Sequence, residues 1–180
     1  VLTQSTLANK ISFSGTGIHT GKRVNMNVLP SSPNSGIIFK RIDLKQNNIV
    51  IPNFANVSEA TLCTTISNEY DVKVSTIEHL MASFLGLGID NALVEIDSQE
   101  VPILDGSAKD FVKILKETGL KKSDVPIKII KINTHIELED GDKYISIDKS
   151  NTTLEIDFEI NYKKKLIKNQ KNKVNIFEDE

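Results

Sequence analysis

The chain is poor in the residue types that mark disulfide-rich secreted proteins and nucleic-acid-binding proteins. Its single cysteine, Cys63, excludes an internal disulfide bond and fits a reducing compartment. Its basic residues are nearly all lysine, with Arg23 and Arg41 as the only arginines. The formal net charge of -2 gives no overall field that would attract a nucleic acid or an anionic membrane. We therefore expect no nucleic-acid partner.

The chain also lacks long apolar runs. No uninterrupted apolar stretch approaches the length of a membrane span, and residues 1–10 lack the basic start and apolar core of a signal peptide. Hydrophobic residues make up 39% and charged residues 26% of the sequence, which is ordinary for a globular protein in water. These features predict a cytoplasmic protein without a membrane span.

The order of strand-like and helix-like patterns predicts an α+β fold. Val24, Met26 and Val28 alternate with polar residues, which is the period-two pattern of a strand. Further strands are expected at residues 37–39, 63–67, 72–74 and 91–96. The segments at 63–67 and 72–74 flank a polar turn, so we expect them to pair as a hairpin.

Two helices are expected in the same part of the chain. Ser75 and Glu78 have the spacing of a capping box, which predicts a helix that begins at Ser75 and ends at Gly86. The apolar stripe of this helix recurs at helical spacing: Ile77, Leu80, Met81, Phe84 and Leu85. A second helix is expected from Ser107 to Gly119.

The second half of the chain predicts strands alone. Residues 121–126 are polar and end in a proline, which indicates a linker. Strand-like segments follow at 127–136, 143–147 and 152–160, with a turn at Asp140-Gly141. Such a short segment buries too little surface to fold alone. We therefore expect a first α+β domain over residues 1–123, and the opening strands of a second domain, with the remainder missing, over 124–180.

Glu78 and His79 are the strongest candidates for chemistry. His79 projects nearly opposite the apolar stripe, where the small side chains of Ala82 and Ser83 would leave room for a metal or a ligand. A histidine is a good zinc ligand, and a carboxylate beside it can deprotonate coordinated water. One ligand is not a zinc signature, however. From spacing alone, a capping Glu78 and a surface His79 remain the stronger interpretation.

His19 lies in a segment with three glycines, which would allow the backbone to approach a ligand closely. The segment lacks the spacing of a P-loop or of a dinucleotide-binding motif, so a glycine-rich hairpin turn is the favoured interpretation. Cys63 lies in a strand pattern and is expected to be a small half-buried residue rather than a nucleophile. His135 lies in a strand that alternates with polar residues, which predicts an exposed side chain.

Taken together, these segments resemble the zinc-dependent UDP-3-O-acyl-N-acetylglucosamine deacetylase family of lipid A biosynthesis in Gram-negative bacteria. The resemblance covers essentially the whole chain and is carried by Gly15-Thr16-Gly17-Ile18-His19-Thr20-Gly21, Leu62-Cys63-Thr64-Thr65, Thr76-Ile77-Glu78-His79, Gly86-Leu87-Gly88-Ile89-Asp90-Asn91, Pro102-Ile103-Leu104-Asp105-Gly106-Ser107 and Asp140-Gly141-Asp142-Lys143. The family fold is a pair of α+β domains of the ribosomal-S5-domain-2-like type. Each is a two-layer sandwich of a sheet packed on two helices, with the active site between the domains.

The resemblance implies an enzyme that hydrolyses the acetamide of UDP-3-O-acyl-N-acetylglucosamine and releases acetate, the committed step of lipid A and lipopolysaccharide synthesis. It implies Zn2+ as the cofactor, His79 as one of three zinc ligands and Glu78 as the general base. Ile18 and Leu62 match positions beside the acyl chain of the substrate, and Cys63 matches a position beside the metal pocket. The partner is thus a small-molecule substrate, and peripheral membrane association is left open.

Three residues of the second half match nucleotide-binding positions of the family. Lys143 matches a lysine near the phosphates, and Asn161 and Tyr162 fall where the family holds uridine. An inserted residue precedes this pair, and lysines replace the His-Pro that follows in the family.

The chain also departs from the family pattern. The other two zinc ligands lie in a later His-Lys-x-x-x-Asp helix, and a further catalytic histidine follows, whereas the last histidine here is His135. We therefore expect the chain by itself to be an inactive fragment or truncation that binds zinc weakly. The alternative is a non-catalytic sugar-nucleotide-binding α+β domain in which Glu78 and His79 are structural. The sequence leaves open the acyl-chain length, the oligomeric state and the role of His19.

Overall fold

The computed structural model of the chain describes residues 2–150, 154–162 and 166–176. The chain divides into two compact units, Val1–Ile127 and Lys128–Glu180. The first unit ends beyond the expected domain boundary at Ser123, because residues 121–126 are not a linker. They belong to strand β10 (Leu120–Pro126), which pairs antiparallel with β1 (Thr3–Leu7). The expectation of a polar linker there was wrong.

The first unit is built on a five-stranded sheet. Its strands lie in the order β2 (Ile11–Thr16), β3 (Arg23–Pro30), β9 (Ala92–Ile96), β4 (Ile37–Arg41) and β5 (Ile49–Val50). Neighbours pair antiparallel except β4 and β9, which run parallel. The alternation at Val24, Met26 and Val28 is confirmed, since all three side chains of β3 are fully buried. Their burial places the core on one face of this sheet.

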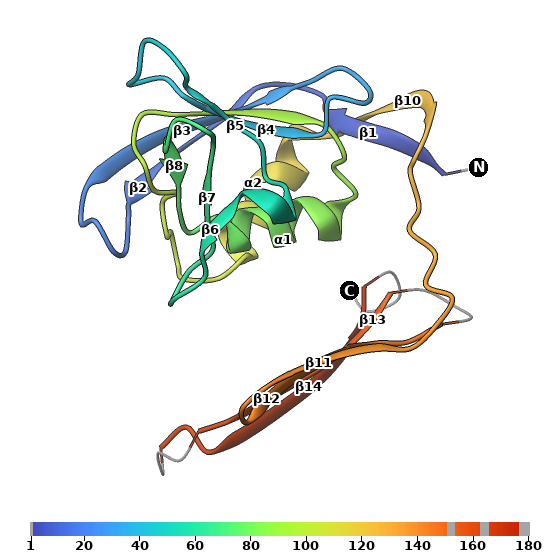
Figure 1. Cartoon of the computed structure of the whole chain (residues 1–180). Coiled ribbons are helices and arrows are strands. Elements are labelled where there is room, and N and C mark those ends of the chain that lie inside the picture. Colours follow the sequence, from blue (N-terminus) through green and yellow to red (C-terminus); the bar gives the residue numbers. More distant parts are fainter. Residues whose placement is uncertain (1, 151–153, 163–165, 177–180) are drawn as a thin grey trace. The chain divides into compact units, whose positions relative to one another are not determined.

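Helices α1 (Glu78–Leu87) and α2 (Lys109–Thr118) lie together on one face of the sheet (Figure 1). Their buried side chains complete the core: the ring of Phe111 on α2 lies 5.3 Å, between centroids, from the ring of Phe13 on β2. The α+β class expected from the sequence is therefore confirmed.

The first turn of α1 differs from the expected one. Ser75 does not cap the helix: its backbone N–H and its hydroxyl both donate to the carbonyl oxygen of Gln99, at 2.9 and 3.1 Å. The helix begins only at Glu78, after Thr76 has taken a positive φ of 56°. The capping box was wrong because pairing with the segment at Gln99 takes up the capping hydroxyl.

The end of α1 also lies further along the chain. Gly86 is inside the helix, and Gly88 takes the left-handed conformation, with its N–H donating to the carbonyls of Leu85 and Phe84. The apolar stripe is correct for Ile77, Leu80 and Phe84, which are buried, but Leu85 is 50% exposed. Ser83 is buried in its place, because α2 packs on that side and the Ser83 hydroxyl donates to Ala108 O. Helix α2 begins at Lys109 rather than at Ser107.

A small three-stranded sheet flanks the first turn of α1. It contains β6 (Val57–Glu59), β7 (Thr65–Ser67) and β8 (Lys73–Val74), preceded by the 3-10 turn η1 (Phe54–Asn56). The expected hairpin is confirmed, with Ile66 opposite Val74. Cys63 lies in the loop before β7 rather than in the strand, and Leu62 in the same loop has a positive φ of 63°.

The second unit consists of two hairpins in its described part. β11 (Ile136–Asp140) pairs with β12 (Lys143–Ile147), and β13 (Glu155–Asn161) pairs with β14 (Asn169–Asn175). The turn at Asp140-Gly141 is confirmed, but the strand expected over 127–136 begins only at its last residue. Residues 152–153 of the last expected strand lie outside the described residues.

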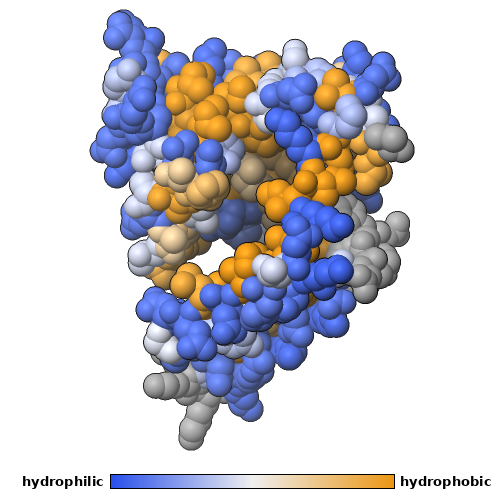
Figure 2. Space-filling view, turned by 45° about the vertical axis from the view of Figure 1, so that its right-hand side comes forward, coloured by the Kyte–Doolittle hydropathy of each residue, from blue (hydrophilic) through white to orange (hydrophobic). Residues whose placement is uncertain are grey.

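The described strands of the second unit leave many apolar side chains exposed, among them Leu138, Ile145 and Phe158. Figure 2 shows such apolar surface in orange. Within the described part of the chain, no helix has the length and apolar character that a membrane crossing requires.

Candidate functional site

Glu78 is held in place by the loop that precedes β7. The backbone N–H of Thr64 donates to Glu78 Oε2 at 3.0 Å, and the N–H of Ile77 donates back to Thr64 O at 3.4 Å. These two contacts fix the first turn of α1 on the loop. Glu78 is half-buried and lies in the first turn of the helix.

His79 is the next residue on the helix and is also half-buried. Its backbone carbonyl accepts the Ser83 hydroxyl at 2.7 Å, whereas no side chain in the described ranges hydrogen-bonds to its imidazole. Ala82 is exposed beside it, as the sequence predicted, but the buried Ser83 does not contribute to an open face. The imidazole nitrogens are therefore available to coordinate a ligand on one side of α1.

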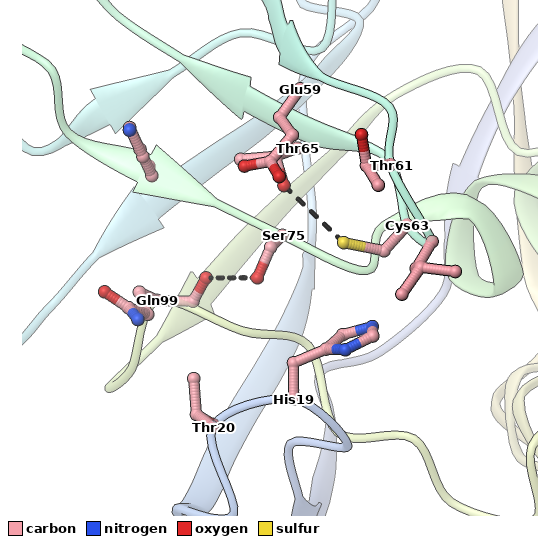
Figure 3. A pocket seen from close by; sticks show the side chains of 10 residues that line it. His19, Thr20, Glu59, Thr61, Cys63, Thr65, Ser75 and Gln99 are labelled. Carbon is pink, nitrogen blue, oxygen red and sulfur yellow. Dashed lines mark hydrogen bonds between the residues drawn. The ribbon is translucent and has the colours of Figure 1, made fainter.

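A pocket of about 370 Å³ opens next to the loop that precedes β7 (Figure 3). In the figure the ring of His19 rises from the β2–β3 turn toward the segments that carry Cys63 and Ser75. The Cys63 sulfur lies 3.7 Å from the hydroxyl of Thr65. The lining residues come from the turn, the small sheet and the segment after β9: His19, Thr20, Glu59, Thr61, Leu62, Cys63, Thr65, Lys73, Ser75 and Gln99.

Glu78 and His79 do not line this pocket. One loop nevertheless connects them to it, because Cys63 lines the pocket while its neighbour Thr64 holds Glu78. Leu62 and Cys63 thus lie in the same loop that holds Glu78, the neighbour of His79. Ile18 lies beside His19 in the β2–β3 turn and is 59% exposed, but it is not among the lining residues.

The remaining candidates lie in the second unit and are described within it. Lys143 is exposed at the first position of β12, opposite Asp140. Asn161 ends β13, and the backbone N–H of the exposed Tyr162 donates to Lys168 O at 3.1 Å. Backbone pairing therefore fixes the positions of all three in their hairpins.

Arg41 joins the central sheet to the small sheet that lines the pocket. Its guanidinium donates to both carboxylate oxygens of Asp43, at 2.8 and 2.6 Å, and to the carbonyl of Lys73 at 2.9 Å. The Arg41 side chain holds the pKa of the Asp43 carboxyl below its ordinary value. This nearly buried cation fixes β8, and with it the wall of the pocket at Lys73 and Ser75.

Sequence reasoning missed Glu100, which is fully buried behind the His19 turn. Its carboxylate accepts the backbone N–H of His19 at 2.9 Å and of Thr20 at 2.8 Å, and the hydroxyl of Thr76 at 3.1 Å. Burial opposes ionisation, yet these donors outweigh it and hold the pKa of Glu100 below its ordinary value of 4.5. The one signal in the sequence is a lone carboxylate directly before the apolar Val101-Pro102-Ile103.

The donors available for a metal ion are few. Over residues 2–150, 154–162 and 166–176, no group of three or more His, Cys, Asp or Glu side chains is arranged to hold a metal ion. His79, with an imidazole that no described side chain hydrogen-bonds, and its neighbour Glu78 match the donor chemistry of a zinc site. They supply one imidazole of such a site.

The comparison with protein families decides the relationship. Residues 4–180 match the family described as UDP-3-O-acyl N-acetylglycosamine deacetylase. The chain belongs to this family. The resemblance carried by the Gly15–Gly21 and Thr76–His79 motifs is therefore confirmed.

Three similar proteins carry the name UDP-3-O-acyl-N-acetylglucosamine deacetylase. The protein of Cellvibrio japonicus is 43% identical over 162 residues, which are 87% of this chain and 53% of that protein. The protein of Methylococcus capsulatus is 41% identical over 162 residues, covering 88% and 53%. The protein of Sodalis glossinidius is 39% identical over 163 residues, covering 91% and 53%. The chain thus spans about half the length of these relatives.

Proposed function

We propose that the complete protein hydrolyses the acetamide of UDP-3-O-acyl-N-acetylglucosamine and releases acetate, in the committed step of lipid A synthesis. Family membership supports the reaction. The observation that carries the site is the Thr64 N–H on Glu78 Oε2, which fixes a carboxylate beside the available imidazole of His79. A general base must be held in one orientation to take a proton efficiently, and this contact provides that.

In this proposal Glu78 is the general base and His79 is a zinc ligand. Thr64 occupies one oxygen of Glu78, so the other oxygen is available to take a proton from the attacking water. A zinc ion held there would polarise the acetamide carbonyl and make the water more acidic. Because His79 follows Glu78 directly on the first turn of α1, the base and the ligand keep a constant separation.

The other site residues receive substrate roles. Ile18 and Leu62 are exposed apolar side chains at 59% and 86%, which suits contact with an acyl chain. Cys63 directly precedes Thr64, which holds Glu78, and this suits a place beside the proposed zinc ion. In the second unit, the Lys143 ammonium suits the phosphates, and Asn161 and Tyr162 supply polar and aromatic groups for uridine.

Further proposals follow from the same family relationship. We propose the ribosomal-S5-domain-2-like sandwich for the first unit and for a second domain that begins after β10 rather than at residue 124. We propose a cytoplasmic protein that acts on a small-molecule substrate. In this proposal the 180-residue chain by itself supplies only one of three zinc ligands, so we expect it to bind zinc weakly and to lack turnover. Robust turnover by the isolated chain would contradict this.

Replacing Glu78 with glutamine in the complete protein tests the function. The variant keeps the shape of the side chain and an oxygen for Thr64, but it cannot accept the proton. We expect kcat for acetate release to fall about 100-fold or more, with zinc content and thermal unfolding unchanged. Chelation should abolish activity in the wild type, and added zinc should restore it.

Glu95→Gln is the matched control. Glu95 pairs with Lys40 on the central sheet, away from the pocket, so its loss should leave kcat unchanged. If Glu78→Gln turns over like Glu95→Gln, the enzyme proposal is wrong. A protein that binds the sugar nucleotide without any turnover would instead support the non-catalytic alternative.

A further inference from the structure

Glu100 is a charged group in a place where charge is costly. It is the one fully buried carboxylate among the described residues, and it lies behind the pocket rather than in its lining. The donors that the structure gives it are backbone N–H and hydroxyl groups, not the side chain of a lysine or arginine. A buried ionised group without such donors would be strongly destabilising, so these contacts determine where the surrounding backbone can lie.

The carboxylate joins two segments that lie far apart in the sequence. Glu100 Oε1 accepts both the His19 N–H and the Thr76 hydroxyl, while Oε2 accepts the Thr20 N–H. The first segment is the turn that places the His19 side chain at the pocket (Figure 3). The second segment leads directly into Glu78 and His79. One side chain therefore sets the separation between both parts of the proposed site.

The Thr76 end of this link is conformationally demanding. Thr76 is β-branched and has a φ of 56°, a conformation that persists only where the surrounding contacts require it. Its neighbour Ser75 is held on both sides, by its own N–H to Gln99 O at 2.9 Å and by the N–H of Val101 to its carbonyl at 3.0 Å. The hydrogen bond from the Thr76 hydroxyl to Glu100 is a third contact that holds this segment in place.

The His19 end is equally restricted. A Cβ atom on Gly17 would lie 2.3 Å from Glu100 Oε2 and 2.5 Å from the Thr20 hydroxyl, so only glycine lets the turn reach the carboxylate. The turn is closed by the Gly17 N–H to Lys22 O and the Gly21 N–H to Gly17 O, both at 2.9 Å. Gly17 therefore serves the approach of the backbone to Glu100.

We propose that Glu100 is a positioning residue for the reaction, which locks the His19 turn and the first turn of α1 to each other. The inference rests on the proposed function, because it assigns His19 to the same site as Glu78 and His79. Glu100 itself touches neither the pocket nor the reacting atoms. Its loss should therefore weaken the alignment of the site more than the binding of substrate.

The test compares Glu100→Gln with the control Glu95→Gln in the complete zinc-loaded protein. Glutamine keeps the size of the side chain, but its NH2 group would face one of the groups that donate a hydrogen bond to Glu100 in the wild type. We expect faster amide hydrogen exchange at residues 17–22 and 76–79, with exchange in β3 and β9 unchanged. We expect kcat to fall at least tenfold while KM stays within twofold and zinc content is unchanged. Glu95→Gln should match the wild type in every measurement.

The inference is overturned if Glu100→Gln keeps the wild-type kcat, or if only one of the two segments exchanges faster. If that variant does not fold, Thr76→Val decides: it keeps the shape at residue 76 and removes only the hydroxyl on Glu100. We expect a threefold or larger loss of kcat in Thr76→Val and recovery in Thr76→Ser. Equal rates in Thr76→Val and the wild type would refute the link.

The exchange measurements separate this inference from the proposed function. If the wild-type protein has no zinc-dependent deacetylase activity, the proposed function fails. The coupled change in exchange at the two segments would then still establish the link through Glu100, and its absence would exclude it.

Discussion

The two units of the chain contain similar strands but bury their side chains very differently. Among the residues that the structure describes, every core residue lies in Val1–Ile127, where α1 and α2 cover one face of the five-stranded sheet. In the described part of Lys128–Glu180, no residue is buried, and most apolar side chains of both hairpins are exposed. Alternating apolar residues form strands in both units, but a sheet acquires a core only when a second layer covers it.

The comparison predicts effects of very different size on stability for two matched aromatic truncations. Phe84 on α1 is 1% exposed, whereas Phe158 on β13 is 60% exposed. We expect Phe84→Ala to lower the free energy of unfolding by about 3–5 kcal/mol, because it removes transfer free energy and leaves a cavity. Phe158→Ala should change it by less than about 0.5 kcal/mol. Urea unfolding of the chain measures both, and equal losses would show that the second unit is covered in solution.

Glutamates in the two units give the next largest contrast. Glu100→Gln should destabilise the first unit by about 1–3 kcal/mol, since hydrogen bonds to a charged group are replaced by weaker ones and one donor loses its partner. Glu139→Gln on the exposed strand β11 should change stability by less than about 0.5 kcal/mol. Thermal unfolding at pH 7 compares the two variants.

The contribution of Glu100 to stability depends on pH. The pKa of Glu100 is lowered on folding, so its contribution to stability is present above the pKa of the unfolded chain and is lost as the pH falls through the lower, folded pKa. The wild type should therefore lose stability in acid more steeply than Glu100→Gln. Parallel acid-unfolding curves for the two proteins would rule out this contribution.

A smaller effect distinguishes the two glycines at the end of α1. Gly86 lies inside the helix, and nothing lies within 4 Å of a Cβ atom placed on it. Gly86→Ala should therefore stabilise the first unit by about 0.5–1 kcal/mol, because alanine loses less backbone entropy. Gly88→Ala should destabilise it, since residue 88 has a φ of 66°. Destabilisation by Gly86→Ala would mean that the helix ends there, as the sequence first indicated.

The smallest effect is expected in the second unit. The exposed His135 imidazole lies 2.6 Å from Asp148 and 3.1 Å from Glu137, and hydrogen bonding to Asp148, then to Glu137, raises its pKa above 6.5. A raised pKa stabilises the hairpin below the pKa of the unfolded chain, and this is lost as the pH rises through the folded value. An NMR titration of His135 should show the shift, and Asp148→Asn should reduce it. An unchanged titration in that variant would remove Asp148 as the cause.

The helix that carries Glu78 shows how far sequence reasoning reached. The spacing of Leu80 and Phe84 predicted the helix and its buried face correctly. It did not predict the start, because the capping role given to Ser75 depended on a hydroxyl that donates instead to Gln99, distant in the sequence. Propensity and spacing are local, whereas the choice of hydrogen-bond partner is made by the whole fold.

The candidate site also has features that the sequence predicted and features that it did not. The adjacency of Glu78 and His79, and the motif around His19, are properties of the sequence and pointed to the family that the comparison confirmed. Which oxygen of Glu78 is held, and which residue supports His19, could not be predicted, because Thr64 and Glu100 reach them across turns and neighbouring strands. The roles of these residues in catalysis stay predictions.

The sequence by itself determined the class of the fold, the strands β3, β4 and β9 of the central sheet and the family, because these depend on residue order and on apolar periodicity. Only the tertiary structure decided that residues 120–126 complete the first unit as β10, and that Glu100 is buried between the His19 turn and Thr76. The reason is physical: strand pairing and the burial of a charge depend on groups that meet only after the chain has folded.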